Sequence, residues 1–319
     1  MSATSSLPPD GPPSLMGTTP AGVCAIVVTY QPDLPVLTRL VNALALQVEQ
    51  IVVVDNGSRT DLEAWAAPLA SSHRLSLRRL EQNLGIAAAQ NVGIALADRA
   101  RCGHAILFDQ DSCPAPDMVA HLLQVLIERT QQGERVASVG PRFVDDRLDN
   151  PPPFIRINGL RYERQACSSA NAVVAVDYLV ASGCLMPLAV LDVVGDMREE
   201  LFIDYVDIEW GLRAGAMGLA SYGVCAAHMH HSLGDQPIAF RGRHYPTRQA
   251  LRHYYMFRNA IWMYRQPGLP LNWKLADGWR LLLKYGFYLL FDKPRLPSWR
   301  MIHRGLLDGL LRRTGPFHA

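Results

Sequence analysis

The chain has 319 residues, 49% of them hydrophobic, and a formal net charge of +2. This length suits one large α/β domain with an appendage, and it allows a sizeable buried core. No apolar run approaches the roughly 18 residues that a transmembrane helix requires, so we expect none.

Residues 1–20, MSATSSLPPDGPPSLMGTTP, are rich in Ser and Pro and lack the basic and apolar regions of a signal peptide. We expect them to form a disordered tail. The six cysteines are scattered and include no CxxC pair. We therefore expect neither a disulfide framework nor a structural zinc site, and a reducing, cytosolic compartment is the default.

Apolar runs and helically spaced segments alternate along the first half of the chain. Strands are expected at 23–30, 49–58, 75–83, 104–111 and 136–144, and helices at 34–47, 61–70, 86–100 and 117–131. This alternation predicts an α/β fold with a mostly parallel, Rossmann-like sheet that has helices on both faces.

Polar residues follow several of these strands where each one ends. Tyr30, Asp55, Asn83 and Asp109 all stand at or near the C-terminal end of a predicted strand. Ligands of such sheets bind beyond the carboxyl ends of the strands, so one crevice would collect all four side chains. The run FDQDS also fits a polar turn, but two carboxylates two residues apart can share a divalent cation that holds a diphosphate.

The second half is less regular. Residues 142–160 look like a loop, and 175–195 predict a strand, a tight Ser-Gly turn and a helix. Residues 201–219 open with polar residues and continue with helical spacing. Segment 271–291 predicts an amphipathic helix.

Charge divides the chain into two unequal parts. Residues 240–319 contain 15 Lys and Arg against 3 Asp, or +12, which leaves −10 for residues 1–239 and sums to the total of +2. Arginines alternating with aromatic residues are compatible with nucleic-acid binding. The amphipathic helix with interspersed Trp and Tyr favours an anionic membrane surface instead. A helical cap with a solvated basic face is an equal alternative.

The motifs AIVVTYQPD, VVVDNGS, QNLGIAAAQNVGIALA, FDQDS and DYVDIEWGLRA, in this order, resemble those of the family 2 glycosyltransferases with the GT-A fold. Within that family the chain is most similar to bacterial rhamnosyltransferases of O-antigen and related polysaccharides. The resemblance covers about residues 23–235. It implies a GT-A catalytic domain over 21–239 and a basic, aromatic-rich helical extension over 240–319.

The resemblance implies a donor site at the sheet edge. Thr29 and Tyr30 would meet the nucleotide, and Asp55 would accept a hydrogen bond from the pyrimidine N3–H, although Asp before Asn-Gly is also a turn signal. Asn83 and Gly85 would let the backbone approach the nucleotide.

On the following helix, Asn91 is placed with the donor-binding residues, and with Gly93 it would help to pack that helix. The family often has Arg at the position of Gln90, so a charged contact from this helix to the diphosphate is in doubt.

A metal site, for Mg²⁺ or Mn²⁺, is implied at the same edge. Asp111 would bind the metal directly, and Asp109 would contact the ribose or reach the metal through water. His231 is the histidine that would complete the site, with His228 second.

Acceptor chemistry is implied at DYVDIEWGLR. Asp207 falls where the family has its general base, with Asp204, Glu209 and Trp210 as acceptor-binding residues. Asp204 would raise the pKa of Asp207, and Trp210 would form an apolar wall against a sugar. A helix start with acidic residues in its first turn also explains Asp204. Glu209 is spaced to pair with Arg213.

The function implied is inverting transfer of L-rhamnose from dTDP-L-rhamnose to a lipid-linked saccharide at the cytoplasmic face of the bacterial inner membrane, with no nucleic-acid partner. The rival interpretations are another donor, such as UDP-galactose or UDP-GlcNAc, and a non-catalytic nucleotide-sugar binding protein. A nucleotidyltransferase is disfavoured because its Gly-rich basic signature after the first strand is missing.

Overall fold

The computed structural model describes residues 22–144, 153–230, 250–292 and 295–318, with the backbone of two short strands between 238 and 245. In its first half, strands and helices alternate as predicted. These elements are β1 (Gly22–Thr29), α1 (Leu34–Ala45), β2 (Gln50–Asp55), α2 (Leu62–Ser72), β3 (Leu75–Arg79), α3 (Ile86–Ala95), β4 (Cys102–Asp109), β5 (Cys113–Pro114), α4 (Met118–Gln131) and β6 (Val136–Val144).

The second half adds shorter strands and the remaining helices. They are β7 (Phe154–Asn158), β8 (Arg161–Gln165), β9 (Val173–Val176), β10 (Leu185–Pro187), α5 (Leu188–Val194), the 3₁₀ turn η1 (Glu199–Leu201), α6 (Val206–Ala216), β11 (Ala220–His230), β12 (Ile238–Phe240), β13 (Arg243–Tyr245), α7 (Ala250–Arg265), α8 (Leu271–Phe291) and α9 (Arg295–Leu310).

The main sheet has the strand order β3-β2-β1-β4-β10-β6-β11-β5, with β9 also paired to β11. Strands β1 to β4 pair in parallel, and so do β6 and β11, whereas β10, β5 and β9 are antiparallel to their neighbours. In the parallel register, Thr29 lies opposite Asp55 and Val28 opposite Asp109. The polar residues that end these strands therefore meet at one edge, as predicted.

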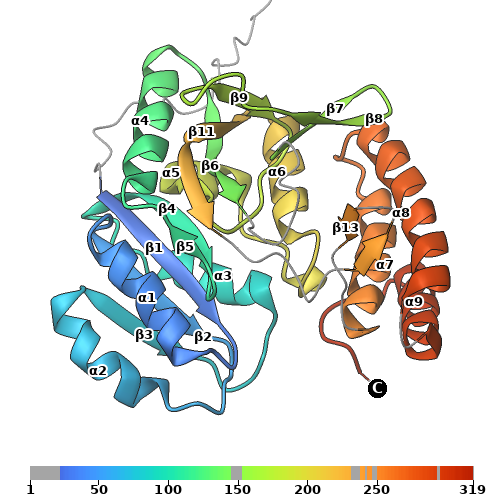
Figure 1. The fold of residues 1–319 in the computed structure, drawn as a ribbon, viewed down its shortest axis with the longest axis horizontal. Coiled ribbons are helices and arrows are strands. Elements are labelled where there is room, and N and C mark those ends of the chain that lie inside the picture. The colour runs from blue at the N-terminus through green and yellow to red at the C-terminus, as the bar shows by residue number, and fades with distance from the viewer. Residues whose placement is uncertain are drawn as a thin grey trace, which may run out of the picture.

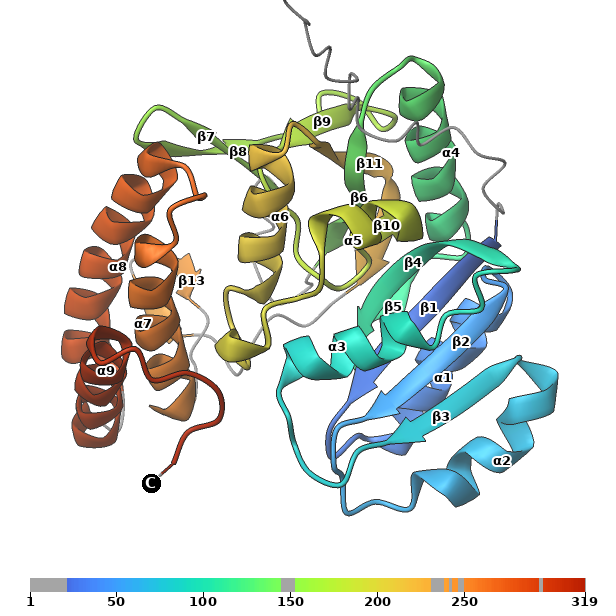
Figure 2. The same ribbon diagram turned by 180° about the vertical axis from the view of Figure 1, so that it is seen from behind.

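Helices cover both faces of this sheet (Figures 1 and 2). Helices α1, α2 and α4 pack on one face, and α3, α5 and α6 pack on the other. Helix α1 buries an apolar stripe at helical spacing, and the side chain of Asp33 caps it by accepting a hydrogen bond from the Val36 amide. In α3, a Cβ on Gly93 would lie 2.2 Å from Ile26, so only glycine lets the helix approach the sheet this closely.

The loop predicted at 142–160 is partly wrong. Strand β6 extends to Val144, and β7 forms an antiparallel hairpin with β8. The three prolines at 151–153 conceal the short alternating run FIRIN that follows them. The hairpin reaches across to α8 (Figure 1).

The C-terminal helices α7, α8 and α9 pack against one another at one side of the molecule (Figure 1). The helix predicted over 271–291 is confirmed as α8. Side chains of α7 and α8, including Phe257 and Trp273, belong to the same hydrophobic cluster as residues of α3 and α6. Of the helices described, none combines the length and apolar character that a membrane span requires.

The expectation that the scattered cysteines form no disulfide is wrong for one pair. Cys167 and Cys225 are bonded, with their Cα atoms 5.8 Å apart. They are separated by 58 residues, and scattered spacing gives no signal for such a pairing. The bond ties β11 to the loop that precedes β9. In a reducing compartment the same pair would be two thiols.

Candidate active site

Gln110, the middle residue of the FDQDS run, joins the ends of β1 and β4. Its Oε1 atom accepts hydrogen bonds from the Thr29 hydroxyl and from the Tyr30 amide, each at 2.8 Å. Thr29 is buried, whereas the Tyr30 side chain is exposed at the sheet edge. These contacts fix the geometry of the two residues predicted to meet the nucleotide, and sequence analysis assigned no role to Gln110.

Asp55 is fully buried at the end of β2. Its carboxylate accepts a hydrogen bond from the Ser58 amide at 3.0 Å and one from Arg79 Nε at 3.2 Å. The first contact is the turn interaction that Asp before Asn-Gly predicts. Because a carboxylate offers about four acceptor positions, these two contacts leave capacity for a further donor, and base recognition by Asp55 stays a prediction.

Two asparagines hold the turns after β2 and β3 together. Asn56 Nδ2 donates to Asn83 Oδ1 at 3.0 Å, and Asn56 Oδ1 accepts from the Leu84 amide at 2.9 Å. Asn83 Oδ1 also accepts from the Gly85 amide. Gly85 has a φ of +92°, and a Cβ there would lie 2.6 Å from the carbonyl oxygen of Phe202. The close backbone approach at Gly85 is therefore to the 202–205 segment.

The two carboxylates of FDQDS differ in exposure. Asp109 is partly buried at the end of β4, and Asp111 is exposed in the turn that follows. The Asp109 amide donates to Ser182 Oγ at 3.1 Å, and the hydroxyls of Ser182 and Ser112 lie 2.6 Å apart. Ser182 of the predicted Ser-Gly turn thus holds the residues at the two ends of the DQDS run, Asp109 and Ser112.

Asp207 lies in the first turn of α6 and is partly buried. Burial raises the pKa of its carboxyl group to about 6, and the negative charges of Asp204 and Asp109 act in the same direction. Hydrogen bonds from the backbone of Ile208 and Ala181 lower this pKa and offset part of the rise. The raised pKa expected from Asp204 is confirmed in direction, with burial as its main cause. Asp207 and Asp109 are close enough to interact electrostatically.

The segment that precedes Asp207 is strained. Phe202, Asp204 and Tyr205 have φ angles of 63°, 65° and 68°, in a region that side-chain-bearing residues rarely adopt. Asn259 of α7 holds this segment, because its Nδ2 atom donates to the carbonyls of residues 201, 203 and 204 at 2.9, 2.7 and 2.9 Å. Strain that is maintained by surrounding contacts is typical of functional sites.

Asp204 is paired with Arg252 of α7. The Arg252 guanidinium contacts both carboxylate oxygens, at 2.7 and 3.3 Å, and the Asp204 side chain is largely buried. This bidentate pair holds the strained segment against α7. The contact of Asp204 with an acceptor stays a prediction.

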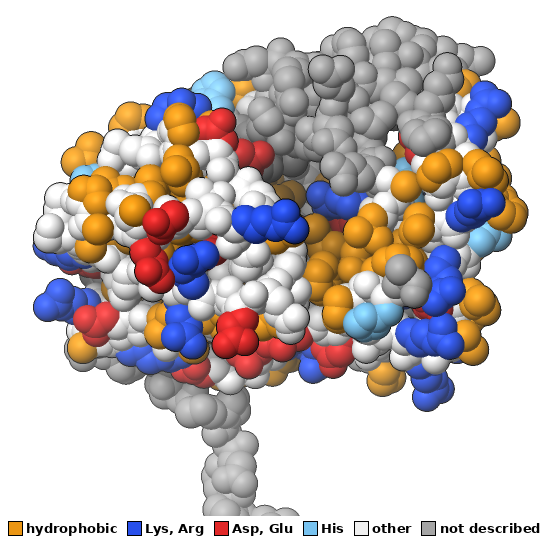
Figure 3. Space-filling model, turned by 90° about the horizontal axis from the view of Figure 1, so that it is seen from below, with side chains coloured by type: hydrophobic (Ala, Val, Ile, Leu, Met, Phe, Trp, Pro, Cys, Tyr) orange, Lys and Arg blue, Asp and Glu red, His pale blue; other side chains and the backbone are white. Residues whose placement is uncertain are grey.

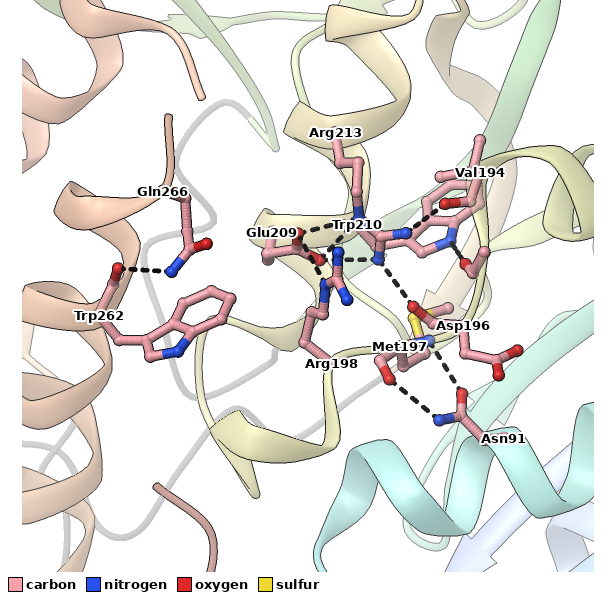
Figure 4. Close-up of polar contacts among 11 residues, drawn as sticks. Asn91, Val194, Asp196, Met197, Arg198, Glu209, Trp210, Arg213, Trp262 and Gln266 are labelled. Carbon is pink, nitrogen blue, oxygen red and sulfur yellow. Dashed lines mark hydrogen bonds and ion pairs between the residues drawn. The ribbon is translucent and has the colours of Figure 1, made fainter. Parts of the chain in front are cut away.

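Glu209 and Trp210 point into the protein (Figure 4). Glu209 is buried and forms the predicted ion pair with Arg213, at 2.9 Å. Trp210 is also buried, and its Nε1 atom donates to the Gly195 carbonyl at 3.0 Å. The burial of both side chains favours a structural role, and the sugar wall expected at Trp210 has no exposed face in this conformation.

Asn91 connects α3 to the segment before η1 (Figure 4). Its amide oxygen accepts from the Met197 amide at 2.9 Å, and its nitrogen donates to the Met197 carbonyl at 3.0 Å and to Glu199 at 2.9 Å. This geometry favours the packing role expected of Asn91 over contact with the donor. The donor contact stays a prediction without support from the arrangement.

A metal at this edge would rely on Asp109 and Asp111. His231 lies outside the described residues, and within the described ranges no three ligand-type side chains form a cluster. Mg²⁺ typically takes one or two carboxylates, together with waters and substrate phosphates. The two aspartates fit that donor set, since both offer hard oxygen ligands at the end of β4.

Several residues that position this site could not be recognised from the sequence. Gln110 and Ser182 brace the strand ends, and Asn259 and Arg252 hold the segment before Asp207. The Gln between two Asp and the Ser-Gly turn were visible signals. Asn259 and Arg252 carry no local signal, because their partners lie about 50 residues away along the chain.

A mostly parallel sheet with paired carboxylates at the carboxyl end of its strands, beside a partly buried carboxylate of raised pKa, suits transfer from a nucleotide-activated donor. Residues 24–180 match the family described as Glycosyl transferase family 2. The chain is 30% identical over 297 residues to "dTDP-rhamnosyl transferase RfbF" of Shigella flexneri, an alignment that covers 92% of this chain and 97% of that protein. The chain therefore belongs to glycosyltransferase family 2 and is a glycosyltransferase.

Solved structures support the same fold. The S. aureus protein TarS, residues 1–349 in complex with UDP-GlcNAc, superposes with a TM-score of 0.58 at 16% identity, covering 92% of this chain and 81% of that chain. GalNAc-T7 with UDP, GalNAc and Mn²⁺ gives a TM-score of 0.55 at 11% identity, covering 85% of this chain and 57% of that longer chain. The predicted GT-A fold is confirmed.

Proposed function

We propose that this glycosyltransferase moves L-rhamnose from dTDP-L-rhamnose to a lipid-linked saccharide, with inversion at the anomeric carbon. The donor assignment is carried by one observation, the near full-length similarity to a protein described as a dTDP-rhamnosyl transferase. The lipid-linked acceptor is supported by the amphipathic C-terminal helices described below.

Asp207 is the general base in this proposal. The acceptor hydroxyl oxygen attacks C1 of rhamnose while Asp207 takes the hydroxyl proton, and the C1–O bond breaks with its electron pair leaving on dTDP. A carboxylate of pKa about 6 is ionised at neutral pH and is more basic than an ordinary Asp. A non-catalytic binding protein would have no use for such a base.

The donor nucleotide occupies the edge formed by Thr29, Tyr30, Asp55 and Asn83, with Asp109 toward its ribose. Asp55 accepts the N3–H of thymine, which a carboxylate does well because it only accepts hydrogen bonds. Asp109 and Asp111 hold Mg²⁺ or Mn²⁺, and the metal when bound neutralises charge on the departing diphosphate.

The C-terminal helices attach the enzyme to an anionic membrane surface. Helix α8 exposes an apolar stripe that includes Leu275, Trp279 and Leu282, and α9 exposes Trp299 and Leu307. Figure 3 shows hydrophobic side chains beside Lys and Arg over the part of the molecule that contains α7 to α9. Apolar side chains beside basic ones favour adsorption to anionic lipid. Cosedimentation with anionic vesicles that weakens with salt is expected, and no binding at low salt would contradict it.

The donor is tested with purified protein, Mg²⁺ or Mn²⁺, and a panel of dTDP-L-rhamnose, UDP-galactose and UDP-GlcNAc. Calorimetry measures binding, and slow hydrolysis of the nucleotide sugar is followed in parallel. We expect dTDP-L-rhamnose to bind most tightly and to be the one hydrolysed. Preference for a UDP-sugar would show that the donor assignment is wrong while leaving the class of enzyme intact.

A further inference from the structure

A groove of about 440 Å³ lies between the β7–β8 hairpin and α8. Three arginines line it: Arg161 and Arg164 from the hairpin and Arg280 from α8. Two aromatic side chains, Tyr162 and Trp279, also line the groove. None of these residues belongs to the donor site described above.

The groove concentrates positive charge. Arg280 lies over the ring of Tyr162, 3.9 Å from its centroid, which holds the guanidinium in place. Burial lowers the pKa of Arg164, and the charge of Arg280 lowers it further, so the two cations are neighbours. Over the chain that the structure describes, neither Arg161 nor Arg280 forms an ion pair with a carboxylate. An anion entering the groove would meet all three of the guanidinium groups that line it.

Hydrogen bonds connect the groove to the segment that precedes the proposed base. Tyr162, which lines the groove, donates to the carboxylate of Asp277. The same carboxylate accepts from Tyr205 at 2.8 Å, and Tyr205 precedes Asp207 by two residues.

The outer wall of the groove is apolar and continuous with the exposed stripe of α8. Trp279 is 62% exposed, and Leu282 and Leu283 follow it at 58% and 56%. Arginines inside the groove and an apolar helix face beside it are complementary to an amphiphile with a phosphate-bearing head and a hydrocarbon chain.

We propose that this groove binds the phosphate-bearing headgroup of the lipid that carries the acceptor saccharide. The phosphate oxygens contact Arg161, Arg164 and Arg280, and the adjoining hydrocarbon lies against Trp279. This inference rests on the proposed transfer to a lipid-linked acceptor and adds the site that recognises its carrier.

Farnesyl diphosphate serves as a short, soluble probe, and its binding is measured by quenching of tryptophan fluorescence. The measurement is made in EDTA, because a bound metal would draw the diphosphate to Asp109 and Asp111. We expect Arg164→Gln and Arg161→Gln each to weaken binding about tenfold, as loss of a charged hydrogen bond does. Arg156→Gln is the control for Arg164→Gln, because Arg156 pairs with Glu163 in the hairpin register, lies on the opposite face from Arg164 and does not line the groove. It should leave the affinity unchanged.

Inorganic diphosphate and farnesol distinguish the parts of the ligand, and both should bind at least tenfold more weakly than farnesyl diphosphate. Equal affinity of inorganic diphosphate would overturn the lipid assignment, and equal effects of Arg156→Gln and Arg164→Gln would overturn the groove. The dTDP affinity of each variant with Mg²⁺ is measured alongside. Intact dTDP binding without farnesyl diphosphate binding refutes this inference alone, whereas absence of nucleotide binding refutes the proposed function.

Discussion

The hydroxyl of Tyr205 donates a 2.8 Å hydrogen bond to the buried carboxylate of Asp277, which joins the segment before α6 to α8. Tyr264 of α7 donates to the same oxygen at 2.8 Å, and Tyr162 of the hairpin donates to the other oxygen at 3.2 Å. The Asp277 carboxylate thus links four segments: α8, α7, the β7–β8 hairpin and the segment before α6. Its three phenolic donors compensate the cost of burying a charge.

Tyr205→Phe should therefore affect both stability and turnover. Loss of a buried hydrogen bond to a charged group costs about 2 kcal/mol in the free energy of unfolding, and freeing the segment before Asp207 should lower kcat. Tyr264→Phe removes an equivalent bond from the same oxygen but lies on α7, so it should cost similar stability and spare kcat. Denaturant unfolding and transfer assays measure the two effects. Equal loss of kcat in both variants would show that the bond has no positioning role.

Asn259→Ala should destabilise the same segment from the other side. The substitution removes three hydrogen bonds to the backbone around the positive-φ residues, and we expect a loss of about 3 kcal/mol in unfolding free energy. Gln266→Ala, which removes one local bond from the residue after α7 to the Trp262 carbonyl, is the control and should cost less than about 1 kcal/mol. Thermal unfolding distinguishes them. Similar melting temperatures for the two variants would be inconsistent with Asn259 holding a strained segment.

Asp207→Asn should lower turnover about 10²–10⁴-fold, the usual contribution of a general base. Donor binding should stay within a few-fold, because Asp207 does not contact the nucleotide in the proposed site. Glu209→Gln should have a smaller effect on turnover, since Glu209 is buried in its pair with Arg213. If Glu209→Gln is inactive while Asp207→Asn is active, the base has been assigned two residues early.

Turnover of the wild type should rise with pH as Asp207 ionises, with a midpoint near its pKa of about 6. The free energy of unfolding should decrease over the same rise in pH. The folded pKa lies above the ordinary value of 3.8, so the folded state binds the proton more tightly, and ionisation destabilises it as pH rises from about 4 to 6. Metal-free Asp207→Asn should accordingly be more stable than wild type at pH 7, by up to about 3 kcal/mol. The difference should vanish below about pH 4, and a pH-independent difference would contradict the raised pKa.

Asp111→Asn should abolish transfer without unfolding the protein, because Asp111 is exposed in a turn and contributes little to the core. Excess EDTA should have the same effect on wild type, and added Mn²⁺ or Mg²⁺ should restore only the wild type. Circular dichroism confirms folding of the variant. Full activity in EDTA would exclude the proposed metal role of the two aspartates.

Local patterns were sufficient to predict the sheet, its flanking helices and the meeting of strand ends. A strand that is buried on both faces of a parallel sheet must be apolar along its whole length, and a helix packed on that sheet needs an apolar stripe. Continuous β-branched runs and helical leucine spacing therefore predict these elements correctly. The segment 49–58, predicted as a strand that ends in a turn, forms β2 up to Asp55, and the turn begins with Asn56 and Gly57.

Long-range polar contacts could not be predicted in the same way. The bonds of Asn259 to the carbonyls before Asp207, and the disulfide of Cys167 with Cys225, join residues more than 50 positions apart without any repeating pattern. The inward orientation of Trp210 depends on the Gly195 carbonyl, which no feature of α6 reveals. Residue type and helical spacing were correct there, but the direction of the side chain depended on tertiary packing.

The contacts of Asn259 and Arg252 with the segment before Asp207 bear on how such enzymes can be recombined. Exchanging the C-terminal helices with those of a relative, in order to change the acceptor, would also exchange the residues that support the proposed base. A chimera joined near residue 240 should be inactive unless the incoming helix carries Asn and Arg at the matching positions. A change of acceptor made by exchanging these helices would therefore also change the support of the proposed base.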